Sequence, residues 1–166
     1  MRPLFIALAV CAIAAPCLAE EPVGCDKFKW PIDKERLILT GDTVAIASGT
    51  KLPHTYPMSV IVDLKPLADA KLPRAPEREP KSPTSFAGFV DVPAPVTAGT
   101  YKISLSAEGW VDVIQNDQFV KASDFSGATG CDVIRKVVKF DLVAQPFTIQ
   151  LSGVASASIR IAITAE

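Results

Sequence analysis

The chain has 166 residues, of which 17 are basic and 18 acidic, so its formal net charge is −1 with its single histidine neutral. This balance has no basic excess that would favour nucleic acid, and it gives no sign of attraction to an anionic membrane surface. The length is that of one domain, so we expect a single folded unit and no nucleic-acid partner.

The N-terminus has the three parts of a secretory signal peptide. Met1-Arg2 gives a positive start, an apolar run follows from Leu4 to Ala15, and small residues end at Ala19. We expect a signal peptide over residues 1–19, cleavage near Ala19 and a periplasmic or secreted protein. The run is too short for a membrane span. A lipid anchor at Cys11 or Cys17 is disfavoured by the large Val10 and by Pro16.

The two cysteines beyond the signal are Cys25 and Cys131. In an oxidising compartment an even pair predicts one disulfide. The alternative is a metal or redox pair. A redox motif needs its cysteines close in sequence and a structural zinc site needs four ligands, so we expect neither a metal nor a cofactor.

The first predicted element is a short helix at about residues 32–39. Pro31 suits a first helical turn, Asp33 and Glu35 are favourable near a helix N-terminus, and Gly41 would end it. A strand over Leu37-Ile38-Leu39 is the alternative, because short apolar runs are ambiguous.

From Thr43 onward apolar residues recur at every second position, as in strands with one buried face. Turn residues separate the runs, including Glu108-Gly109 and Asn116-Asp117. We expect an all-β protein, residues 20–166, built as an antiparallel, jelly-roll-like β-sandwich of eight or nine strands. The clearest runs are residues 44–46, 60–64, 101–105, 110–114, 138–142, 147–151 and 159–163.

The stretch from Pro66 to Pro95 holds seven prolines and several charged residues. Such a composition is incompatible with a central strand or a regular helix. We expect an extended surface connection over residues 66–95, interrupted by a strand at about Ser85 to Val90. The alternative is a docking arm for a protein partner.

The strongest candidate binding residues are Trp110, Asp112 and Tyr56. Trp110 and Asp112 alternate with Val111 and Val113, so they should share one face of a strand. An aromatic ring beside an acid is typical of a sugar-binding surface, where the ring contacts the sugar face and the acid its hydroxyl groups. The alternative is an ordinary outward strand face.

Catalytic patterns are scarce. The chain contains no Gly-x-Ser-x-Gly elbow, phosphate loop or His-Glu-x-x-His motif, and a hydrolytic triad would have to use His54 in a proline-bracketed loop. Glu77 and Glu79 lie among arginines, so we expect them to be solvated ion-pair partners of these arginines rather than general acids. We therefore predict no catalytic residues and a non-enzymatic protein.

Six segments carry a family resemblance: Cys25-Asp-Lys-Phe-Lys-Trp-Pro, Phe86-Ala-Gly-Phe-Val, Ala98-Gly-Thr-Tyr, Trp110-Val-Asp-Val, Cys131 and Phe140-Asp-Leu. Together they resemble an uncharacterised family of small exported proteins of alphaproteobacteria, over most of the chain after residue 19. Some members carry the name homogentisate dioxygenase, whose chemistry uses an iron held by two histidines and a carboxylate. One histidine cannot supply that set, so the resemblance implies export but not this activity.

The leading hypothesis is a non-enzymatic periplasmic β-sandwich that binds a ligand, with carbohydrate as the ligand considered, or a protein partner of the envelope. The alternative is a structural or docking subunit of a cell-envelope complex that uses the proline-rich segment. The third hypothesis is a small hydrolase that uses His54.

Overall fold

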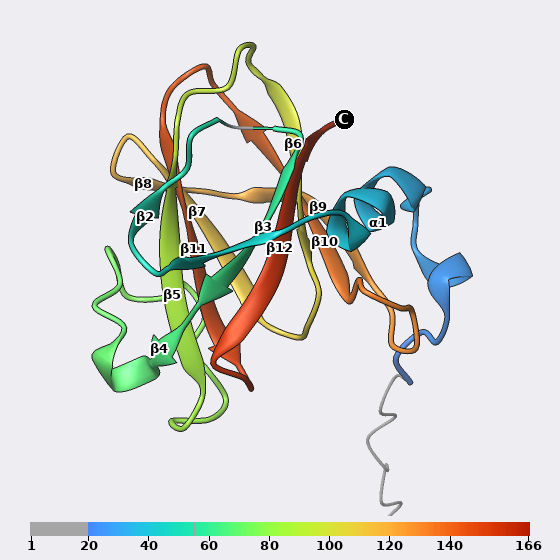
Figure 1. The fold of residues 1–166 in the computed structure, drawn as a ribbon, viewed down its shortest axis with the longest axis horizontal. Coiled ribbons are helices and arrows are strands. Elements are labelled where there is room, and N and C mark those ends of the chain that lie inside the picture. The colour runs from blue at the N-terminus through green and yellow to red at the C-terminus, as the bar shows by residue number, and fades with distance from the viewer. Residues whose placement is uncertain (1–19, 55) are drawn as a thin grey trace, which may run out of the picture.

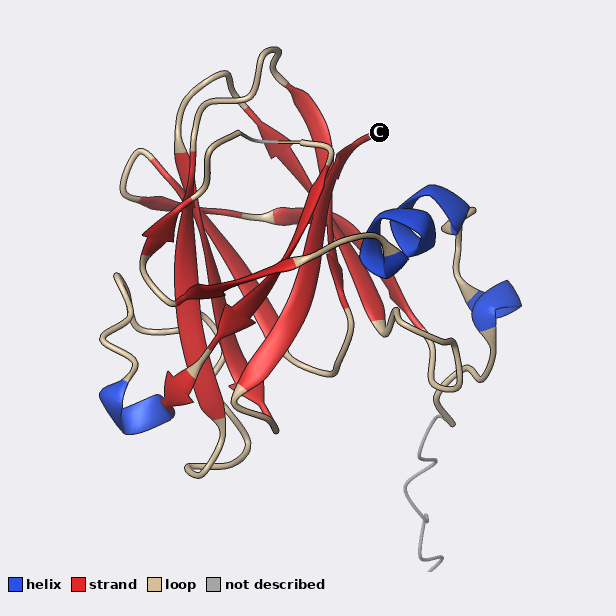
Figure 2. Ribbon diagram, viewed as in Figure 1, coloured by secondary structure: helices blue, strands red, loops and turns tan. Residues whose placement is uncertain are grey.

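The structure, a computed structural model, describes residues 20–54 and 56–166, so the expected signal peptide lies outside the described residues. Two mixed sheets pack face to face as a β-sandwich, with a short α-helix against one of them (Figures 1 and 2). The mainly-β sandwich predicted from the period-two pattern is confirmed.

The first sheet has six strands, in an order that places the C-terminal strand between β3 and β6. All neighbouring pairs from β3 to β9 are antiparallel. In spatial order the strands are β1 (Val44–Ala47), β3 (Met58–Asp63), β12 (Ser158–Ala165), β6 (Gly99–Leu105), β10 (Lys136–Leu142) and β9 (Ala122–Gly127).

The second sheet is a row of five strands, and a sixth short strand pairs with β5 outside this row. Their order is β2 (Thr50–Lys51), β5 (Phe86–Val92), β11 (Phe147–Val154), β7 (Trp110–Gln115) and β8 (Gln118–Val120), and the extra strand is β4 (Lys65–Pro66). The turn between β7 and β8 is the predicted one. Asn116 and Asp117 have φ of 53° and 59°, as a tight primed hairpin requires.

The sheets are not purely antiparallel as expected, because one edge of each contains a parallel pair. β1 runs parallel to β3, and β2 runs parallel to β5. The chain leaves β1 in the first sheet, crosses to β2 in the second, and only then returns to β3. Such a crossover allows β1 and β3 to run in the same direction, which a tight hairpin does not.

The core lies between the two sheets, where alternate residues of the long strands are buried. Ile103, Phe140, Leu151 and Ile161 are each at most 2% exposed and belong to one apolar cluster. β-branched and aromatic residues suit these positions because they pack well on a pleated surface. Removing this apolar area from water is the main stabilising contribution of the sandwich.

The N-terminal segment covers the outer face of the first sheet. It contains a short 3₁₀ helix, η1 (Cys25–Lys27), and the α-helix α1 (Asp33–Thr40), close to the predicted range 32–39. Leu39 is fully buried in a second apolar cluster with Phe28, Ile32 and Val137. Cys25 forms the predicted disulfide with Cys131, with 4.7 Å between their Cα atoms.

The proline-rich segment is largely irregular, as predicted. A 3₁₀ helix, η2 (Leu67–Asp69), follows β4, and residues 71–84 then contain no helix or strand before β5 begins at Phe86. We call residues 71–84 the strap. Among the described residues, no helix is both long and apolar enough to cross a membrane.

Candidate binding site around Trp110

Trp110 is the first residue of β7, at an incompletely covered edge of the second sheet. β8 pairs only with Val113, Ile114 and Gln115, so the start of β7 extends beyond this neighbour. On its other side β7 pairs with β11, where Ser152 lies opposite Trp110 and Gln150 lies opposite Asp112. Trp110 and Asp112 therefore lie on the same face of β7, as predicted.

Asp112 is buried and holds the indole in place. Its Oδ1 accepts a 2.5 Å hydrogen bond from Nε1 of Trp110. Its Oδ2 accepts two bonds of 3.3 Å, from the backbone N–H of Glu77 and from Nε2 of Gln150. Burial raises the pKa of the Asp112 carboxyl, and the three hydrogen bonds oppose that rise. Asp112 is 2% exposed, so it supports the indole rather than facing solvent.

The strap is fastened to the same face of the sheet. The backbone N–H of Arg74 donates to Oε1 of Gln150 at 3.2 Å, and its side chain donates to the carbonyl oxygen of Asp117 at 2.6 Å. Arg74 also lies over the Phe119 ring at 5.1 Å, and Arg78 over the Trp110 ring at 5.3 Å. The strap is thus held across β7 and β11 by these two cation–π contacts and by two backbone hydrogen bonds to buried side chains, from Arg74 to Gln150 and from Glu77 to Asp112.

A hollow of about 170 Å³ opens where the strap passes Trp110, and we call it the Trp110 hollow. Besides the indole, polar side chains from the strap and from the ends of β6 and β10 surround it. They are Arg78, Glu79, Lys81, Ser82, Glu108 and Lys136. Gly153 also lines it, and the buried hydroxyl of its neighbour Ser152 has no hydrogen-bond partner within the described residues.

The charges around the Trp110 hollow fall into two groups. Glu108 is engaged, at 3.2 Å from Nζ of Lys136 and 2.9 Å from Arg135. By contrast, Arg78, Glu79 and Lys81 are exposed, and none forms an ion pair with another described residue. One side of the hollow therefore carries a preformed salt-bridge cluster, and the strap side carries charged groups that are available to a ligand.

Tyr56, the third predicted binding residue, lies elsewhere. It packs edge-to-face on Tyr101, with 5.1 Å between the ring centroids. Tyr101 lies near the start of β6, whereas Trp110 follows the end of that strand, and four residues of strand span about 13 Å. Tyr56 and Trp110 thus belong to opposite ends of the sandwich. Burial raises the pKa of the Tyr101 hydroxyl, which donates to the carbonyl oxygen of Thr97 at 2.7 Å.

His54 is exposed in the loop before β3. Within residues 20–54 and 56–166, no hydrogen bond or ion pair joins it to a serine or a carboxylate. The same residues contain no group of three or more His, Cys, Asp or Glu side chains that could hold a metal ion.

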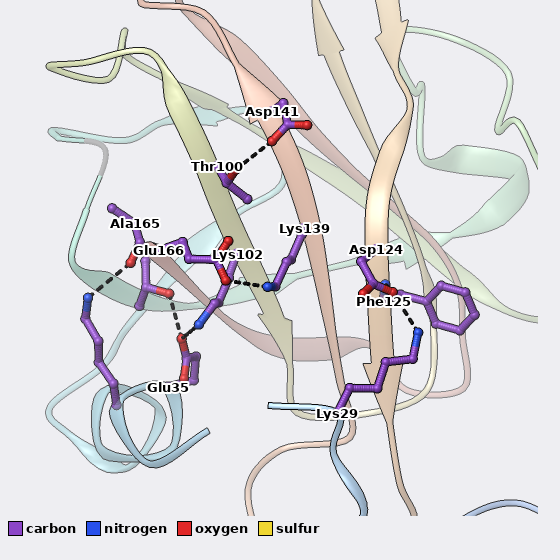
Figure 3. A network of polar contacts seen from close by, with 12 residues as sticks. Lys29, Glu35, Thr100, Lys102, Asp124, Phe125, Lys139, Asp141, Ala165 and Glu166 are labelled. Atoms are coloured by element: carbon purple, nitrogen blue, oxygen red, sulfur yellow. Dashed lines mark hydrogen bonds and ion pairs between the residues drawn. The ribbon is translucent and has the colours of Figure 1, made fainter. Parts of the chain in front are cut away.

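A second polar cluster lies between α1 and the first sheet, and its members pair with one another (Figure 3). The buried Glu35 carboxylate is 3.3 Å from Nζ of Lys102 and accepts a 3.0 Å hydrogen bond from Thr164. Lys139 forms an ion pair with Glu166 and lies 4.2 Å from the centre of the Trp30 ring. Because these charges are matched within the protein, the cluster orients the helix and offers no open group to a ligand.

Two residues of the site were not predicted: one had no clear signal in the sequence, and the other had a signal that was not used. The strap residues that approach Trp110 are some 30 positions away along the chain, and nothing in their local pattern pairs Arg78 with an indole. Lys136 is the second. It precedes Val138 by two positions, so the strand period places both on one face, which is a signal that was present.

A comparison of the chain with known protein families, curated proteins and solved structures finds no match.

Proposed function

We propose that this is a non-enzymatic exported binding protein, and that the Trp110 hollow is its saccharide-binding site. The observation that carries the proposal is a half-buried indole beside exposed hydrogen-bonding side chains that are not paired within the described part of the protein. The expected export from the signal peptide and the resemblance to exported proteins accord with such a role.

The indole and the strap would share the recognition. A sugar ring presents an apolar face of C–H groups and a rim of hydroxyl groups, which suit an aromatic ring and polar side chains respectively. Glu79 can accept hydrogen bonds from hydroxyl groups, and Lys81 can donate them. The hydrogen bond from Trp110 to Asp112 fixes the indole before the ligand arrives, which lowers the entropic cost of binding.

The strand order supports a jelly-roll-like architecture for this binding protein. Along the chain, β3, β5, β6 and β7 alternate between the two sheets, and so do β10, β11 and β12. The central rows β3-β12-β6-β10 and β5-β11-β7-β8 are two sets of four, as in an eight-stranded jelly roll. This is fold-level support only, because many functions use such sandwiches.

The two other hypotheses have less support. A docking role for the proline-rich segment would favour an arm free of its own domain, but Arg74, Glu77 and Arg78 all contact the second sheet. A hydrolase would need His54 beside a nucleophile and an acid, and no described residue supplies such a pair of contacts.

The test is a glycan-array screen of the mature protein, followed by calorimetric titration of the best ligand into Trp110→Ala. We expect binding to be lost, at least tenfold, with only a small change in melting temperature, because the indole is half-buried. Trp30→Phe is the matched control, since this tryptophan packs beside α1 and should leave affinity unchanged. Unchanged affinity in Trp110→Ala, or no saccharide bound by the intact protein, would refute the proposal.

A further inference from the structure

A second opening lies on the other side of Trp110, between the two sheets. It has a volume of about 150 Å³, and its walls are apolar, formed by Trp110, Val111, Ala122, Phe125 and Val138. We call it the edge slot. It is separate from the polar Trp110 hollow, although the indole and two cations, Arg78 and Lys136, line both.

The edge slot exists because the second sheet ends early. β8 pairs with β7 only from Val113 onward, so the start of β7, with Trp110 and Val111, extends past β8 at this edge, and the slot lies between it and β9. Phe125 on β9 pairs with Val138, whose side chain belongs to the core between the sheets. Phe125 shares this inner side but is 61% exposed. The Lys29 ammonium lies 5.2 Å from the centre of this ring, which otherwise forms a largely exposed apolar surface.

The charged groups at the edge slot are both positive. Lys136 lies two residues before Val138 on β10, so it also points to the inner side, and its side chain is only 17% exposed. Its ammonium group donates to the carbonyl oxygen of Gly109 at 2.8 Å. Arg78 lies at the mouth, over the indole. No carboxylate lines the slot, in contrast to the Trp110 hollow with its Glu79 and Glu108.

We propose that the edge slot binds a small apolar monocarboxylate of about one ring. Apolar walls favour an uncharged hydrocarbon body, and Arg78, which forms no ion pair with another described residue, favours a single negative charge at the mouth. The size agrees, because a dry apolar cavity of about 150 Å³ holds one benzene molecule. The carboxylate would accept hydrogen bonds from the Arg78 guanidinium, and the Lys136 ammonium, which is already paired with Glu108, would lie beside it. This site is independent of the saccharide proposal.

The test is a titration of the ¹⁵N-labelled mature protein with sodium benzoate, monitored at the indole N–H signal of Trp110. We expect a saturable shift with benzoate and a much weaker effect with benzyl alcohol, which has a similar ring but no charge. Arg78→Gln should weaken benzoate binding about tenfold, because it removes a charge-assisted hydrogen bond. Lys81→Gln is the matched control, since Lys81 lines the Trp110 hollow but not the edge slot.

A second variant keeps the proposal open to refutation if Arg78 has other roles. Ala122→Phe places a ring at the slot wall from an exposed position, and should abolish benzoate binding with little change in melting temperature. Equal weakening by Arg78→Gln and Lys81→Gln would show a general charge effect and overturn the proposal. Equal affinity for benzyl alcohol and benzoate, or no saturation, would overturn it as well.

Discussion

The outer face of each sheet is covered by a segment that contains no strand, but the chemistry of the two covers differs. On the first sheet, Phe28, Ile32 and Leu39 bury apolar surface, and a disulfide fixes the segment that carries them. On the second sheet, the strap is held by hydrogen bonds to Asp112 and Gln150 and by cations over aromatic rings. The first cover is mainly apolar and crosslinked, with a matched ion-pair cluster beneath its helix, and the second is polar and non-covalent.

This difference separates stability from binding. Apolar burial and a crosslink stabilise the fold but leave little for a ligand to contact. A polar strap contributes less net free energy, because its hydrogen bonds replace hydrogen bonds to water. It leaves an indole and charged groups at the surface. We therefore assign the structural role to the N-terminal cover and the binding role to the strap.

The largest expected effect comes from removing the covalent cover. Cys25→Ala with Cys131→Ala opens a crosslink between residues 106 positions apart, and we expect a loss of about 3–4 kcal/mol in the free energy of unfolding. Urea denaturation of the oxidised protein and the double variant measures it. A loss below about 1 kcal/mol would show that the apolar cluster alone holds the segment, and the contrast between the two covers would then disappear.

The long strands and the helix could be predicted because their sequence signals are local. The disulfide could be predicted because few cysteines are present. Alternation over seven or eight residues defines β6, β10, β11 and β12 whatever their partners are. With two cysteines left after the signal, only one pairing within the chain exists. The strands β2, β4 and β9 were missed, whereas β1 was predicted, and the parallel pairs were missed as well. Strands of two residues carry no period, and their pairing depends on the crossover between sheets.

The site was less predictable. The sequence placed Trp110 and Asp112 on one face, which is a local relation. It could not show that Asp112 is covered by the backbone of Glu77, because that contact joins strand and strap across 35 positions. Tyr56 and Trp110 were grouped by residue type alone. They lie near opposite ends of β6, and this separation depends on the topology of the whole sandwich.

The second prediction concerns the polar cover. Asp112→Ala leaves the Trp110 indole N–H, the Glu77 backbone N–H and the Gln150 amide without their acceptor. We expect a loss of about 2 kcal/mol, the typical cost of unsatisfied buried donors. We also expect faster trypsin cleavage in the strap after Arg74, Arg78 or Lys81. Its matched control is Asp124→Ala, which removes an exposed ion pair with Lys29 and should cost about 0.5 kcal/mol or less. Equal losses, or unchanged cleavage, would show that Asp112 does not hold the strap.

The smallest expected effect is the pH dependence of the same contact. Burial raises the pKa of Asp112 in the folded state, so the fold favours its protonated form. This raised pKa contributes to the free energy of unfolding. The contribution is fully present below the pKa of the unfolded state, about 3.9, and is lost as the pH rises through the raised pKa of the folded state.

Asp112→Asn is neutral at every pH and lacks this dependence, while the other carboxyl groups titrate alike in both proteins. We therefore expect the stability of the original protein, measured relative to Asp112→Asn by urea denaturation, to fall by about 1 kcal/mol or less between pH 3.5 and 6.5. A relative gain toward neutral pH would mean that the three hydrogen bonds outweigh burial. The polar cover would then be tightest with Asp112 ionised, and the strap would be held more firmly at neutral pH than we infer.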